Sequence, residues 1–137
     1  MQLIVPATGP LCELHTRHAP KPEYFEKHHI IPQSWQRVWK PDSPSAKLWD
    51  PRTMTLCRTS HGNVHFWLVN LMRAYSASAE PRSVDQAVAA AVTKYKVTHT
   101  MWIKPKEIKV ARMAMDRYLE AGGDLYGLGQ VGQWGQI

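Results

Sequence analysis

The chain has 137 residues, a formal net charge of +6 and 44% hydrophobic residues, including six tryptophans. This length suits one domain, and the apolar content excludes global disorder. The sequence contains neither an apolar run of about 18 residues nor a basic-then-apolar leader, so we expect no membrane span, no Sec export and a cytoplasmic location. Two cysteines are too few for a disulfide scaffold, and the positive charge favours a polyanionic partner.

The first half of the chain predicts short elements joined by irregular segments. Residues 11–27 show no clear period, apart from a short knuckle at 12–15, and residues 27–32 (KHHIIP) predict a short strand closed by a proline. Three prolines in residues 33–51 exclude long regular structure. We expect an ordered loop there, pinned to the body by three tryptophans: Trp35, Trp39 and Trp49.

The second half predicts a strand followed by helices. Residues 54–57 (MTLC) predict a second strand, and Thr59 or Ser60 can cap a helix over 61–77. Residues 83–95 and 105–121 show the helical period, with Gly122 ending the second of these helices. Their expected apolar faces are Val84, Val88, Ala91, Val92 and Tyr95, and Ile108, Ala111, Met115, Tyr118 and Leu119. Residues 122–137 are rich in glycine and glutamine and predict a flexible tail.

Four histidines form the most informative pattern. His28 and His29 are adjacent on the first strand, whose period of two sends their side chains to opposite sides. His61 and His65 lie four apart on a helix and therefore share one face, a common way to grip a metal ion. The joint spacing is more restrictive than either pair alone.

The segments HHIIP, MTLC and HGNVH, in this order, resemble the HNH endonucleases, also called ββα-metal or His-Me finger endonucleases. The resemblance covers residues 11–73. It implies an α+β fold: a small ββα-metal motif with an irregular N-terminal segment and additional C-terminal helices. Residues 1–121 would form a single HNH nuclease domain, with the motif core at 11–73 and a helical extension at 83–121.

The resemblance also assigns roles in the site. His28, His61 and His65 would hold a divalent metal ion, as in members with an all-histidine site, and His29 would be the general base. The metal would act as a Lewis acid on a phosphodiester while His29 takes a proton from water. Imidazole ligands suit zinc or nickel better than magnesium or manganese, but the resemblance does not fix the metal.

Arg52 departs from the family pattern, because the family has its middle asparagine in this slot. An arginine donates hydrogen bonds but cannot accept them. Asn63 lies between the two helix ligands and points away from them, so it is a poor substitute. Arg52 therefore has two open roles in catalysis: a structural one at the strand entrance, which would leave His29 less well oriented, or a direct contact with phosphate.

A second, structural zinc site is also implied. Many family members carry two CxxC knuckles, which appear here as Cys12-x-x-His15 and Cys57-x-x-Ser60. Cys12, His15 and Cys57 remain as ligands, and His18 could supply the fourth. The alternative is that Cys57 is a small buried apolar residue and that Cys12 has no special role.

The sequence thus predicts a metal-dependent HNH endonuclease that cleaves DNA, with Arg58 and Arg73 contacting backbone phosphates. The size resembles phage-encoded HNH proteins that act beside packaging enzymes, which implies a phage terminase or packaging complex as a partner. Two alternatives stay open. One is a catalytically weak HNH-fold module that binds DNA or a protein of a larger machine, and the other is a purely structural zinc protein.

Overall fold

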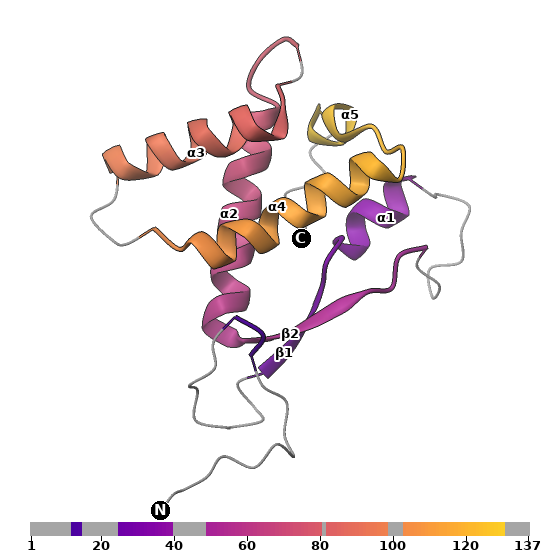
Figure 1. Cartoon of the computed structure of the whole chain (residues 1–137). Helices are drawn as coiled ribbons and strands as arrows, with labels where there is room; N and C mark the ends of the chain where they lie inside the picture. Colours follow the sequence, from indigo (N-terminus) through magenta and orange to yellow (C-terminus); the bar gives the residue numbers. More distant parts are fainter. Residues whose placement is uncertain (1–11, 15–24, 40–48, 81, 99–102, 131–137) are drawn as a thin grey trace, which may run out of the picture.

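The computed structural model describes residues 12–14, 25–39, 49–80, 82–98 and 103–130. Within these ranges the fold is α+β, as predicted, with a two-stranded sheet and helices around it (Figure 1). No helix in the described part of the chain is long and apolar enough to cross a membrane.

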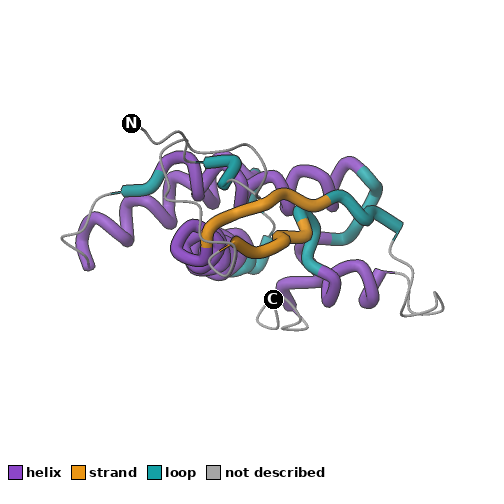
Figure 2. The backbone as a smooth tube through the Cα atoms, turned by 90° about the horizontal axis from the view of Figure 1, so that it is seen from below, coloured by secondary structure: helices purple, strands orange, loops and turns teal. Residues whose placement is uncertain are grey.

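The sheet places the two adjacent histidines. Strand β1 (Phe25–His29) pairs antiparallel with β2 (Thr53–Cys57), and His28 lies opposite Met54 while His29 lies opposite Thr53. Both strands match the predicted segments to within a few residues. Figure 2 shows the two strands as a narrow ribbon beside the end of the long helix α2 (Arg58–Tyr75).

Helix α2 begins directly after β2, with Cys57 as its N-cap residue, so the predicted caps Thr59 and Ser60 already lie inside the helix. The Cys57 sulfur accepts a hydrogen bond from the backbone N–H of Ser60. This direct strand-to-helix join fixes the direction in which α2 leaves the sheet. It therefore also fixes where His61 and His65 lie relative to β1.

Two further helices pack across α2 and complete the core. They are α3 (Val84–Thr98) and α4 (Pro105–Glu120). A capping box, in which Ser83 and Gln86 exchange hydrogen bonds, precedes α3. Gly122, whose φ is 90°, follows the end of α4. Both helices were predicted. The buried set joins apolar residues of every helix and of β2, together with Ile31 after β1: Ile31, Trp35, Leu56, Val64, Trp67, Leu68, Leu71, Met72, Ala87, Ala91, Ala111, Met115, Tyr118, Leu125 and Leu128.

The structure corrects three predictions. Residues 33–39 form the helix α1 (Gln33–Trp39) instead of loop, because the prolines at 41, 44 and 51 all fall after it. The tail is not wholly irregular: α5 (Leu125–Gln130) buries Leu125 and Leu128, which gives this segment an apolar anchor, while residues 131–137 lie outside the described part. Leu119 is 38% exposed, and Val110 and Ala114 lie on the buried face of α4 instead.

Candidate metal centre

Three histidines from two elements converge beside the sheet. Helix α2 presents His61 and His65 on one face, and β1 presents His28 toward them. Each offers a ring nitrogen, and these nitrogens all lie within 4.8 Å of one another. The ring centroid of His28 lies 5.2 Å from that of His61 and 5.7 Å from that of His65. The predicted ligand set is thus brought together in space.

His28 is prepared to act as a ligand. It is 2% exposed, and neither of its ring nitrogens has a hydrogen-bond partner. Burial, reinforced by His61 and His65, lowers the pKa of His28 to about 3, so the ring is neutral near pH 7. Buried polar atoms are normally bonded, and a metal ion would satisfy one of these two nitrogens. The residues present therefore fit a metal ion.

Glu26 is a site residue that the sequence reasoning missed. Nδ1 of His61 donates a hydrogen bond to the Glu26 carboxylate at 2.9 Å, which leaves Nε2 with its lone pair. This Nε2 lies 2.9 Å from Nε2 of His65. A carboxylate behind a histidine ligand fixes its tautomer and orientation. The pKa of Glu26 is lowered, first by this hydrogen bond, and Arg58 lies 3.7 Å away on its other side.

His29 lies on the same cavity as the three histidines, although it follows His28 on the strand. The cavity holds about 210 Å³. The amide of Gln33 on α1 donates to Nε2 of His29 at 3.1 Å, because a side-chain NH₂ group has no acceptor. Nε2 therefore carries the lone pair in this arrangement. The lining residues are Lys27, His28, His29, Pro32, Gln33, Ser34, Arg37, His61 and His65.

Arg52 does not line this cavity. Its guanidinium makes two hydrogen bonds to Asp50, from Nε at 2.8 Å and from Nη2 at 2.7 Å, and its side chain is 61% exposed. The pair holds the pKa of the Asp50 carboxyl below its usual range. The structure thus places Arg52 in an ion pair at the end of the β1–β2 connection and away from the histidine cavity.

Gln36 ties down the segment between the two strands. It is 1% exposed, and its amide donates to the carbonyl oxygens of Ile31 and Asp50, both at 2.9 Å, while its oxygen accepts from the backbone N–H of Asp50 at 2.9 Å. The backbone of Arg52 also accepts a hydrogen bond from the N–H of Ile30 at 3.1 Å. Gln36 on α1 thus joins the two ends of the connection between the strands, and no local pattern in the sequence points to this role.

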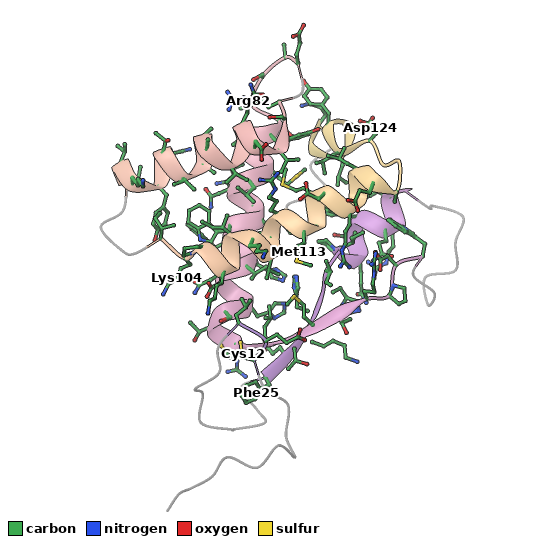
Figure 3. All side chains as sticks on the ribbon, viewed as in Figure 1. Cys12, Phe25, Arg82, Lys104, Met113 and Asp124 are labelled. Atoms are coloured by element: carbon green, nitrogen blue, oxygen red, sulfur yellow. The ribbon has the colours of Figure 1, made fainter. Side chains whose placement is uncertain are left out.

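The predicted structural zinc site is only partly within the described residues. Cys12 and Cys57 are both buried, they form no disulfide, and they lie close enough to interact. Ser60 bonds to Cys57 at 3.3 Å and to the buried Glu107 at 3.5 Å. Figure 3 shows Cys12 near the start of α2. His15 and His18 lie outside the described residues, so the zinc site stays a prediction.

The predicted DNA contacts occupy the outer side of α2. Arg58 and Arg73 are both exposed, at opposite ends of the helix. Fifteen residues separate them, so they lie about 60° apart around the axis and about 22 Å apart along it. Lys27 and Arg37, in contrast, line the histidine cavity itself and bring two positive charges to its edge. The position of Arg37 depends on α1, which the sequence analysis did not predict.

Comparison with known proteins adds no relative from which a role could be transferred. Neither a protein-family model nor a curated protein nor a solved structure matches the chain.

Proposed function

We propose that the protein is a metal-dependent endonuclease of the HNH type that hydrolyses phosphodiester bonds in DNA. The observation that carries this proposal is the convergence of four histidines on one cavity edged by two cations. Three of them form a ligand group, and the fourth, His29, lies beside them with a partner on its ring. A purely structural metal site would need no such additional histidine and no cationic edge.

His28, His61 and His65 would hold the metal ion, with Glu26 behind His61. The ion would supply Lewis-acid stabilisation of the negative charge that develops on the phosphate and on the leaving 3′ oxygen. Three protein ligands leave room for substrate, which is the pattern of catalytic sites as opposed to closed structural ones. An all-nitrogen donor set favours zinc or nickel over magnesium and manganese.

His29 is the general base in this proposal. Its Nε2 takes a proton from water as the water oxygen forms a bond to phosphorus and the bond to the 3′ oxygen breaks. Gln33 holds the tautomer in which Nε2 has the lone pair, and it is exposed, so it can give way to water and substrate. Lys27 and Arg37 at the cavity edge attract and orient the phosphate.

The test is conversion of supercoiled plasmid to nicked and linear forms with single divalent metals. We expect cleavage that a chelator abolishes, and a loss of two or more orders of magnitude in His29→Ala with metal affinity retained, since general-base catalysis contributes about 10²–10⁴-fold. Full activity of His29→Ala would refute the mechanism. A metal-binding but inactive wild-type protein would instead favour the catalytically weak module or the structural zinc protein.

Glu26→Gln tests the metal centre separately from the chemistry. The amide keeps the size of the side chain but lacks the charge that draws the proton of His61 Nδ1. We expect metal affinity to fall about 10–100-fold, as is typical when the partner behind a histidine ligand is lost. Thr59→Val is the control, because Thr59 is exposed and lies two residues before His61 on α2. This change should leave metal affinity unchanged.

A further inference from the structure

A group of lysines lies on the helical extension, outside the histidine cavity. Between residues 94 and 109 the sequence has five lysines and one carboxylate, Glu107, which is buried against Ser60. Four of the lysines are exposed and one is half-buried. We call this the lysine surface; its members are Lys94, Lys96, Lys104, Lys106 and Lys109.

The lysine surface combines the end of α3 with the beginning of α4, and both lie on the same side of α2 (Figures 1 and 2). Figure 3 labels Lys104 at the start of α4. Among the described residues, no carboxylate forms an ion pair with any of these five lysines. The charges are therefore not neutralised within the described part of the fold.

Two of these lysines lie at the start of α4, where Lys106 also donates a hydrogen bond to the backbone carbonyl of Leu14 at 3.3 Å. Lys104 is the N-cap residue of α4 and makes no capping bond, and Lys106 lies in the first turn. The N-terminal end of a helix is positively polarised, so a cation there is unfavourable by about 0.3–1 kcal/mol. Residues that are unfavourable for the local structure are found mainly at functional sites.

The surface connects to the histidine centre through aromatic side chains. Phe66 directly follows His65 and is 40% exposed. Its ring lies 5.9 Å from that of Tyr95, and Tyr95 lies between Lys94 and Lys96 on α3. The outer side of α2, which carries Phe66, thus runs from the metal ligands to the lysine-bearing end of α3.

We infer that the lysine surface binds the phosphate backbone of duplex DNA on the flank of the cleaved bond. This inference rests on the proposed function and extends its footprint from the motif to the C-terminal helices. Lysines without an ion-pair partner can contact DNA phosphates whatever the base sequence. The affinity of such contacts falls steeply with salt, because each phosphate contact releases counterions. DNA is favoured over other polyanions because the surface is continuous with a centre suited to phosphodiesters.

The experiment measures binding of a fluorescent duplex by the full chain carrying His29→Ala, over a series of salt concentrations. Lys106→Gln/Lys109→Gln changes two exposed lysines that lie three positions apart and therefore on one face of α4. It should lower the slope of log affinity against log salt by about 1.8, since each contact contributes about 0.9. That change corresponds to about 60-fold weaker binding at 0.1 M salt. Lys109→Gln should give half of this slope change.

Arg82→Gln is the matched control for the single variant. It removes one positive charge at the opposite end of α3, where Arg82 bonds to Ser78, and it should leave the slope unchanged. The same slope in the double lysine variant as in its parent would overturn the inference. So would a double variant that keeps its DNA affinity but loses binding to phosphatidylserine vesicles, because the surface would then take anionic lipid.

Failure of this inference can be told apart from failure of the proposed function. If the protein with His29 intact nicks plasmid while the lysine variants bind duplex like their parent, only the lysine surface is wrong. If the protein neither nicks plasmid nor binds duplex, the proposed function fails and the inference fails with it.

Discussion

Gln36→Met should destabilise the protein strongly, although Gln36 carries no charge and does not line the histidine cavity. Methionine has a similar length and no hydrogen-bonding amide. The change would leave three backbone groups without their partner, namely the carbonyls of Ile31 and Asp50 and the N–H of Asp50. A buried polar group left unsatisfied costs about 1–3 kcal/mol, so for three such groups we expect a loss of at least about 3 kcal/mol in the free energy of unfolding.

This loss is large against the 5–15 kcal/mol typical of a whole domain, and it should lower Tm by about 10 °C. Urea unfolding and calorimetry measure it. Gln33→Met is the matched control, because it makes the same chemical change one turn earlier at an exposed position. Its stability should stay within about 0.5 kcal/mol of the parent, while its nicking rate falls through the lost contact with His29. A Gln36→Met protein within about 1 kcal/mol of the parent would refute the role of Gln36 in closing the loop.

Three further predictions concern stability and metal content. Gly62→Ala should stabilise the protein by about 1 kcal/mol in urea unfolding, because Gly62 is inside α2 and an added Cβ would meet nothing within 4 Å. Arg52→Asn should lower the free energy of unfolding at pH 7, because Arg52 lowers the pKa of Asp50 and so stabilises the fold while the Asp50 carboxyl is ionised. This deficit should shrink as the pH falls below about 4, the ordinary pKa of an aspartate, because the carboxyl then becomes protonated. A deficit that is equal at pH 7 and pH 3 would contradict the pairing. Metal analysis after His28, His61 and His65 are all changed to alanine should still find zinc, and Cys57→Ser should remove it.

The sequence could predict the elements whose signal is local. The spacing of His61 and His65 requires only a helix, and that helix is present, with both side chains on one face. Strand alternation predicted only that His28 and His29 point to opposite sides; in the structure His28 is 2% exposed and His29 is half-buried, and both line the histidine cavity. The same alternation could have located Glu26, which is two residues before His28 and therefore on the same side of the strand.

Other features depend on contacts between distant residues and left no local signal. The prolines in residues 33–51 led to the prediction of a loop for the whole segment, although the seven residues of α1 contain no proline. Without α1, Gln33 and Arg37 could not be assigned to the cavity. The sequence also did not predict the full width of the buried face of α4. Val110 and Ala114 are buried and Leu119 is 38% exposed, and this difference depends on which elements pack beside the helix.

Arg52 shows why a departure from a motif must be judged in the fold. The asparagine that the HNH endonucleases of the proposal carry at this position can both donate and accept hydrogen bonds, and an arginine cannot accept. Here the two tasks fall to different side chains. Gln36 donates to and accepts from the backbone of the loop, and Asp50 accepts from Arg52. Because these bonds tie the loop independently of an asparagine at 52, the substitution by itself gives no reason to expect a poorly oriented His29, and Arg52→Asn should act on stability before it acts on turnover.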